Sequence, residues 1–313
     1  MEQNIKSNYD RRTAKIARYW PLVEKGKRGS PVSLQVAMTD SCFNRCIGCG
    51  HPFRPQRRMG VGRWLNFVSG LQPLVESVCY SGGDPFAEPE FNRVMQWHID
   101  EGVDFGCTVT GFVPHYVDFV LLSAAKWVRV SLDAVDPDVY EKVRGKTPLD
   151  KVLLGIDSML RHGVNVELGV TLHPANEGQL PKLYDFAKGK GIKQVHTRYA
   201  YPNSNALWKD VGLADRGVLK FEHCNAVFYQ LYIDSDGSVF PCCITAGDTR
   251  KETQSKTLGN IFTDAWPAIW AQAVSYSKLT LNELPPICKT CCVKRLSEIN
   301  HACDNMPSGK SFF

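Results

Sequence analysis

Residues 42–49 read Cys-Phe-Asn-Arg-Cys-Ile-Gly-Cys and directly follow a strand-like run at residues 32–38. Three cysteines so close together in one loop can bind one corner of a compact metal centre. A cubane iron–sulfur cluster takes four ligands, usually thiolates, so a loop that supplies three leaves one iron open to a ligand from outside the protein. A closed zinc site is the alternative, because His51 follows Cys49 by two positions and could complete a tetrahedral set with Cys42 and Cys46.

The spacing Cys-x3-Cys-x2-Cys resembles the signature of the radical S-adenosylmethionine (SAM) enzymes. In that family the open iron binds the amino and carboxylate groups of SAM, and reduction cleaves SAM to a 5′-deoxyadenosyl radical that removes a hydrogen atom from the substrate. The resemblance implies SAM and a [4Fe–4S] cluster as cofactors, an external one-electron reductant of the flavodoxin or ferredoxin type as a partner, and Cys42, Cys46 and Cys49 as cluster ligands. The sequence departs from the family at Gly48, where an aromatic residue often meets the adenine, so no adenine contact is assigned.

The composition of this 313-residue chain is that of an ordinary globular protein, and no run approaches the roughly 18 apolar residues of a membrane span. The net charge of +5 arises in the first thirty residues, which hold eight Lys or Arg and three acids. This segment has no apolar core and is not a secretory signal, so we predict a basic leader at residues 1–30 of a cytoplasmic protein. Twelve cysteines in such a chain indicate metal ligation in a reducing compartment.

A second motif follows the short apolar strand predicted at residues 77–80. It reads Ser81-Gly82-Gly83-Asp84-Pro85, and a strand, a glycine turn and a helix in succession are typical of a βα unit. The motif resembles the Gly-Gly-Glu-Pro motif of the family, which hydrogen-bonds the SAM amino group, with Asp in place of Glu. The resemblance implies SAM contacts at Ser81, Gly82, Gly83 and Asp84, whereas an ordinary βα turn is the alternative.

Strand-like and helix-like segments alternate from residue 32 to residue 201, which predicts a parallel sheet with helices on its outer face. The predicted strands are residues 32–38, 77–80, 104–110, 127–132, 164–172 and 194–201. The predicted helices are residues 62–71, 88–101, 114–126, 136–144, 149–162 and 177–190. The family resemblance implies an α/β fold at residues 31–203, a partial (β/α)6 TIM-like barrel with its site at the carboxyl ends of the strands.

Further candidate SAM contacts stand at and after the end of the fourth strand. The segment Val130-Ser131-Leu132-Asp133 resembles a family segment that lies beside the SAM ribose and carboxylate, which implies contacts from Ser131 and Asp133. Arg144, in the next helix, is a candidate partner of the carboxylate. The alternative for Arg144 is a surface pair with Glu141, three residues earlier on the same helix.

Basic side chains suggest where a substrate could bind. His196 and Arg198 share one face of the sixth strand by the two-residue period, and Arg198 is a candidate catalytic base, although a guanidinium gives up its proton reluctantly. Four arginines follow the cluster loop, and they either face a phosphate or carboxylate of the substrate or decorate a surface loop. These four are Arg54, Arg57, Arg58 and Arg63.

Beyond residue 204 the barrel pattern ends and a second group of cysteines begins. A hairpin is predicted at residues 228–240 with its turn at residues 234–237, followed by a helix at residues 265–273. The spacing Cys-x12-Gly-x4-Cys resembles the start of the auxiliary-cluster extension of radical SAM enzymes. Because Ser297 stands where the larger SPASM version would place a cysteine, the match is to the shorter twitch version, a small α+β module at residues 204–313 with one auxiliary [4Fe–4S] cluster. The resemblance implies as ligands Cys224, Cys242, Cys288 and Cys291; a zinc knuckle is the alternative.

The resemblance implies hydrogen abstraction from a carbon of a small molecule, of the sugar, aminocyclitol or nucleotide type, for dehydrogenation or epimerisation. Cys243, if it is not a ligand, is a candidate hydrogen donor for epimerisation. Peptide modification is a further alternative, weakened because about thirty residues before the first strand are too few for a leader-peptide-binding domain. A zinc-stabilised nucleic-acid-binding protein is the alternative from another class, but no recognised nucleic-acid module is found.

Overall fold

Nine strands form one curved sheet in the part of the chain that the computed structural model describes, residues 28–47, 49, 55–72, 74–199, 222–247, 257–285 and 288. The strand order is β6-β5-β4-β3-β2-β1-β7-β8-β9, and β1 to β6 pair in parallel. These six are β1 (Ser33–Thr39), β2 (Ser77–Gly82), β3 (Asp104–Val109), β4 (Trp127–Ser131), β5 (Val166–Leu172) and β6 (Val195–Tyr199). The prediction of six parallel strands is confirmed.

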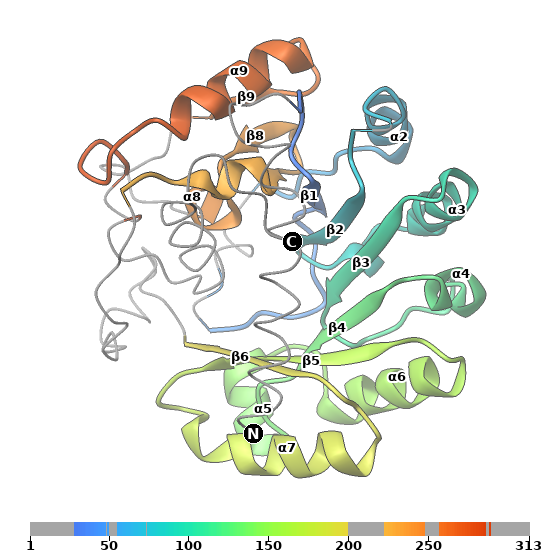
Figure 1. Cartoon of the computed structure of the whole chain (residues 1–313). Coiled ribbons are helices and arrows are strands. Elements are labelled where there is room, and N and C mark those ends of the chain that lie inside the picture. The colour runs from blue at the N-terminus through green and yellow to red at the C-terminus, as the bar shows by residue number, and fades with distance from the viewer. Residues whose placement is uncertain are drawn as a thin grey trace, which may run out of the picture.

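Helices cover the outer side of the curved sheet (Figure 1). The structure has α2 (Val61–Ser69), α3 (Phe91–Glu101), α4 (Phe119–Ser123), α5 (Pro137–Arg144), α6 (Leu149–Arg161) and α7 (Leu180–Gly189), with short 3-10 turns η3 (Pro85–Ala87) and η4 (Glu177–Gln179). Each predicted helix therefore has a counterpart, and the α/β class and partial-barrel architecture are confirmed. None of the described helices is long and apolar enough to cross a membrane.

The prediction of a long helix at residues 114–126 is wrong, because α4 covers five residues of it. The side chain of Asn92 binds the backbone on either side of residue 117, donating to the Tyr116 carbonyl at 2.7 Å and accepting from the Asp118 amide at 3.1 Å. Asp118 is extended, and its carboxylate caps the helix by accepting from the next turn. Contacts made by Asn92, from another helix, therefore override the local helical pattern.

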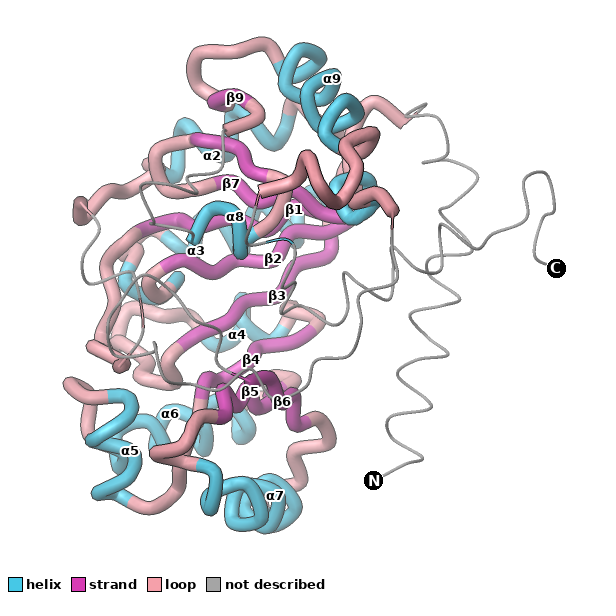
Figure 2. The backbone as a smooth tube through the Cα atoms, turned by 90° about the vertical axis from the view of Figure 1, so that its left-hand side faces the viewer, coloured by secondary structure: helices cyan, strands magenta, loops and turns pink. Residues whose placement is uncertain are grey.

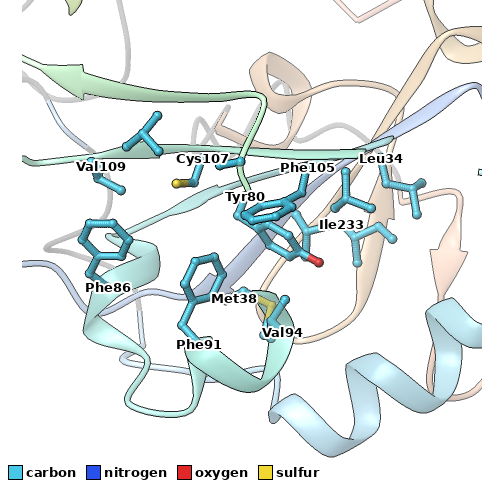
Figure 3. Close-up of a cluster of buried hydrophobic side chains, with 14 of the residues drawn as sticks. Leu34, Met38, Tyr80, Phe86, Phe91, Val94, Phe105, Cys107, Val109 and Ile233 are labelled. Atoms are coloured by element: carbon cyan, nitrogen blue, oxygen red, sulfur yellow. The ribbon is translucent and has the colours of Figure 1, made fainter. Parts of the chain in front are cut away.

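The main core lies between the sheet and its outer helices. Tyr80 of β2 and Phe105 of β3 are buried on this side, and the Tyr80 ring packs edge-on against Phe91 of α3 with centroids 5.2 Å apart (Figure 3). Burying such side chains stabilises the fold by about 2 kcal/mol each. The outer face of the sheet therefore holds the helices in place.

The inner face of the sheet is polar. Its side chains alternate with the core residues and are half-buried where the outer ones are fully buried; they include Gln35, Ser81, Thr108, Arg129, Ser131, Glu167, Thr171 and His196. A closed TIM barrel fills its interior with branched apolar side chains. A polar inner face indicates instead that this interior binds a ligand. Figure 2 looks onto this side of the sheet.

The predicted hairpin is confirmed, and it extends the barrel sheet. Strands β7 (Gln230–Ile233) and β8 (Ser238–Phe240) pair antiparallel, and β7 also pairs in parallel with β1, with Leu34 opposite Leu231. The other described elements of this region are η6 (Asn225–Phe228), α8 (Cys243–Gly247), β9 (Gly259–Asn260) and α9 (Trp266–Tyr276). The predicted boundary between residues 203 and 204 lies outside the described residues.

Candidate functional site

The three-cysteine loop begins at the end of β1 and lies along the end of α5. The amides of Arg45 and Ile47 donate to the carbonyls of residues 144 and 143, at 3.2 and 3.0 Å. Thr147 completes the attachment, its amide donating to Asn44 Oδ1 at 3.1 Å and its hydroxyl donating to the carbonyl of residue 43 at 2.9 Å. These contacts hold the loop that carries Cys42, Cys46 and Cys49 in place at the carboxyl edge of the sheet.

The thiols of this loop are close enough to act on one another. Burial raises the pKa of Cys42 to about 12, and Asp84 and the other two cysteines add to the rise. Burial also raises the pKa of Cys46, an effect that Arg144 opposes. Within the described ranges no three His, Cys, Asp or Glu side chains surround a single metal ion. A cubane does not need such convergence, because each cysteine binds a different iron, so the loop suits a three-ligand cluster. His51 lies outside the described residues.

The two glycines at the end of β2, Gly82 and Gly83, bring this strand end against the cluster loop. The Gly83 and Asp84 amides donate to the carbonyls of Thr39 and Ser41, both at 2.8 Å. A Cβ on Gly83 would lie 2.0 Å from the Ser41 carbonyl oxygen, and Gly82 has a φ of +112°. Only glycine permits this approach, so the two backbones are in close contact beside the cysteines.

The Asp84 carboxylate is fully buried and bound by the protein itself. Oδ1 accepts from the Phe86 amide at 2.9 Å, and Oδ2 accepts from the amide and hydroxyl of Thr110 at 2.8 and 2.6 Å. Burial raises the pKa of Asp84, although these hydrogen bonds oppose the rise. A carboxylate has about four acceptor positions, and three are used: one caps η3, and two join the end of β2 to the end of β3. Its contact with the SAM amino group stays a prediction.

Asp133 and Arg144 form a buried ion pair beside the cysteines. Arg144 Nη1 lies 3.1 Å from Asp133 Oδ2, and Asp133 Oδ1 accepts from the Thr171 amide at 2.7 Å. The partner of Arg144 is thus Asp133 and not Glu141. Burial alone would lower the pKa of Arg144, but Cys46 and Asp133 raise it. Arg144 Nε is buried without a partner in the described structure, which leaves a donor for a carboxylate or for a cluster ligand. Ser131 lies half-buried on the inner face of the sheet.

A cluster of Arg129, Glu167 and His196 lies on the inner face, farther from the carboxyl edge of the sheet. No sequence motif marks Arg129 or Glu167. Glu167 Oε2 accepts from Arg129 Nη2 at 2.8 Å and lies 2.9 Å from His196 Nε2. Arg129 and His196 together lower the pKa of Glu167 against the effect of burial. Arg198 is exposed and donates from Nε to Thr171 Oγ1 at 3.0 Å. A charged residue at an inward position of an otherwise apolar strand was the signal for Arg129 and Glu167.

Three of the four predicted auxiliary ligands affect one hydroxyl group. The Tyr276 hydroxyl lies 3.6 Å from Cys288 Sγ. Burial raises the pKa of Tyr276, and the electrostatic effects of Cys288, Cys224 and Cys242 raise it further. Cys291 lies outside the described residues. Helix α8, which begins at Cys243, lies on the inner side of the sheet (Figures 1 and 2).

Two arginines after the cluster loop have structural partners. Arg57 pairs with Asp40 at 3.1 Å, with Asp234 at 3.3 Å and with Asp236. The Arg63 guanidinium lies over the Phe262 ring, 3.6 Å from its centroid. Both arginines thus hold the hairpin region against the barrel. For these two residues, the prediction that they face a substrate anion or decorate a surface loop is therefore wrong. Arg58 lies 3.8 Å from Glu88, and residue 54 lies outside the described residues.

Two family models match the regions that carry these cysteines. The model of the radical SAM superfamily matches residues 36–187, and the SPASM iron–sulfur cluster-binding domain matches residues 224–292. The chain belongs to the radical SAM superfamily, and SAM and [4Fe–4S] clusters are its cofactors. This membership favours iron–sulfur clusters over the zinc sites that the spacing had left open. The predicted number of auxiliary clusters, one, stays a prediction.

Curated relatives include nucleotide-processing enzymes. GTP 3′,8-cyclase of Nautilia profundicola is 26% identical over 184 residues, which are 54% of this chain and 58% of the relative. The GTP 3′,8-cyclase of Rhizobium etli is 27% identical over 170 residues, 51% of this chain and 49% of the relative. The chain therefore spans about half the length of the curated relatives it matches.

Solved structures share the fold at low sequence identity. Streptococcus suis SuiB bound to S-adenosylmethionine has a TM-score of 0.63 and 14% identity, covering 77% of this chain and 66% of that chain. The enzyme anSMEcpe with bound AdoMet has a TM-score of 0.61 and 15% identity, covering 86% and 88%. These likenesses establish the radical SAM fold.

Proposed function

We propose that this enzyme abstracts a hydrogen atom from a carbon of a small hydroxylated molecule, with nucleotides as the first substrates to test, and completes a dehydrogenation. The main support is the polar inner face of the sheet. There Arg129, Glu167 and His196 lie half-buried, farther from the carboxyl edge than the cysteine loop. The relatives named GTP 3′,8-cyclase support a nucleotide.

The residues around the cysteine loop provide for SAM. In the family, SAM bound at the open iron supplies the radical that removes the hydrogen atom. Arg144 has a free Nε donor beside Cys46 and is held by Asp133, so it would bind the SAM carboxylate. Ser131 stands on the inner face, two residues above Arg129 on the same strand, and would contact SAM from the substrate side. With these assignments, SAM would bind inside the barrel at the carboxyl end of β4.

We assign the base to Glu167 in place of Arg198. After loss of a hydrogen atom, dehydrogenation releases one proton to a base and one electron to an acceptor. Glu167 Oε1 has no partner among the described residues, while Oε2 is held by Arg129 and His196. Arg198 acts as a donor to Thr171, and a guanidinium that donates in this way suits an anion, such as a substrate phosphate. The electron would pass to an auxiliary cluster.

Epimerisation is the second candidate. Cys243 directly follows the predicted ligand Cys242 and opens α8 on the inner side of the sheet. A thiol in this position could return a hydrogen atom to a substrate radical from the auxiliary-cluster side. Peptide modification stays an alternative, because the structural neighbours include SuiB bound to the precursor peptide SuiA.

The test uses the 313-residue chain, reconstituted anaerobically. We expect about eight irons per chain, as two four-iron clusters require, and release of 5′-deoxyadenosine when SAM and dithionite are present. With GTP and other nucleotides, we expect Glu167→Gln to lower product formation at least about tenfold while 5′-deoxyadenosine is still formed. Solvent deuterium in the product and loss of turnover in Cys243→Ala would favour epimerisation instead. Zinc in place of iron, with SAM intact, would overturn the whole proposal.

A further inference from the structure

Tyr276 ends α9, and its hydroxyl lies beside the thiol of Cys288, one of three cysteines from different parts of the chain that raise its pKa. Cys224 precedes η6, Cys242 follows β8, and Cys288 follows α9. The hydroxyl lies 3.6 Å from Cys288 Sγ, a distance at which the larger sulfur atom still forms a hydrogen bond. The tyrosine ring is half-buried and packs against the hydrophobic core, so the position of the hydroxyl is set by packing and not by the cysteines alone.

The chemistry of a bound thiolate decides the direction of this hydrogen bond. A cysteine that coordinates a metal has lost its proton, so Cys288 Sγ would be an acceptor. A tyrosine hydroxyl has an ordinary pKa near 10 and keeps its proton at neutral pH. Tyr276 must therefore be the donor whenever the cluster is present.

The nearby hydroxyl of Thr245 does not play the same role. It lies 3.7 Å from Cys242 Sγ, but it donates to the Cys242 carbonyl at 2.8 Å and accepts from the Cys242 amide at 3.3 Å. Its proton is thus held by the backbone. The Tyr276 hydroxyl makes no bond within the described residues except the one to Cys288.

We propose that Tyr276 is a positioning residue for the auxiliary cluster, and that its hydrogen bond to the Cys288 sulfur raises the reduction potential of that cluster. Reduction adds negative charge to a cluster, and hydrogen bonds to its sulfur atoms stabilise that charge. A cluster that is easier to reduce accepts the electron of a substrate radical more readily. The inference rests on the proposed function, since it adapts the auxiliary cluster to dehydrogenation.

The main experiment is a redox titration followed by electron paramagnetic resonance. It uses the full chain with Cys42, Cys46 and Cys49 all changed to alanine, so that the signal comes from the auxiliary cluster. Tyr276→Phe removes one oxygen atom and keeps the ring. We expect reduction to become about tenfold less favourable, a shift of about 59 mV to lower potential for one electron. Tyr184→Phe, at an exposed tyrosine of α7, is the matched control and should leave the potential unchanged.

A second variant keeps the proposal testable if Tyr276→Phe fails to bind the cluster. Site-specific 3-fluorotyrosine at position 276 keeps the shape and makes the hydroxyl a stronger donor, so the potential should rise. Electron–nuclear double resonance should also show an exchangeable proton coupled to the cluster, absent in Tyr276→Phe. An unchanged potential in the fluorinated variant, or an equal shift in Tyr184→Phe, would overturn the proposal. Absence of a four-iron signal in the triple-alanine chain with Tyr276 intact would instead overturn the auxiliary cluster itself.

Discussion

Single residues around the cysteine loop are held in place by neighbours from other elements. Arg144 is buried between Asp133 and Cys46, and Gly83 fits where a Cβ would meet the carbonyl of Ser41. A buried charge needs a partner, and a closely approached backbone needs glycine. This end of the site therefore depends on a few residues that tolerate little change.

The ion pair between Asp133 and Arg144 gives a test at this scale. Asp133→Asn leaves a buried guanidinium without its counter-charge, and we expect a loss of about 3–5 kcal/mol of folding free energy together with weaker SAM binding. The control is Asp157→Asn, which breaks the exposed pair with Lys190 and should cost at most about 1 kcal/mol. Chemical denaturation and equilibrium dialysis with SAM measure both effects. Equal stability of the two variants would contradict the structural role of Arg144.

At the scale of elements, the turn between β7 and β8 is tied to the end of β1. Arg57 contacts Asp40 at the end of β1 and the two acids of the turn, while Ser235 Oγ donates to Asp40 Oδ1 at 3.0 Å. Asp40 is fully buried and stands two residues before Cys42. Because of these contacts, the hairpin region supports the start of the cysteine loop.

Arg57→Gln tests this connection. Removing the guanidinium leaves three carboxylates facing one another, so we expect a loss of about 3 kcal/mol or more and less iron bound after reconstitution. Arg93→Gln is matched to it, because Arg93 makes an exposed pair with Glu90 on α3 and should behave like the unmodified chain. Thermal unfolding and iron content per chain are the measurements. Full iron content and unchanged stability in Arg57→Gln would show that the hairpin does not support the loop.

Across the whole molecule, the sheet runs from the barrel strands into the hairpin without interruption. β1 has β2 on one side and β7 on the other, and Leu231 and Ile233 of β7 are fully buried. Strands that share one sheet and one core are expected to unfold together. The barrel and the hairpin should therefore form one cooperative unit.

Leu231→Ala tests this cooperativity. The cavity left by a buried leucine costs about 2–5 kcal/mol, and we expect the loss to lower the stability of the barrel as well as of the hairpin. Far-ultraviolet circular dichroism, dominated by the barrel, and tryptophan fluorescence, to which Trp266 and Trp270 of α9 contribute, should report one transition at the same midpoint. Leu154→Ala, at an exposed position of α6, is the control. Two separate transitions would show that the two regions fold independently.

Much of this protein follows from local patterns in its sequence. The spacing of Cys42, Cys46 and Cys49, the glycine pair after β2, the alternation of six strands with helices, and the hairpin turn at residues 234–237 are all short-range features. Each depends on residues that are neighbours along the chain. The family, the fold class and the cofactors can therefore be inferred from the sequence by itself.

The tertiary structure alone decided which distant groups meet. Arg57 and Asp234 are 177 residues apart in the sequence, Glu167 and Arg129 come from neighbouring strands, and Cys224 raises the pKa of Tyr276 from another part of the chain. The local period shows which face a side chain occupies, but not which element packs against that face. The ion pairs, the polar interior and the hydroxyl at the auxiliary cysteines therefore depend on the packing of elements, which no spacing in the sequence records.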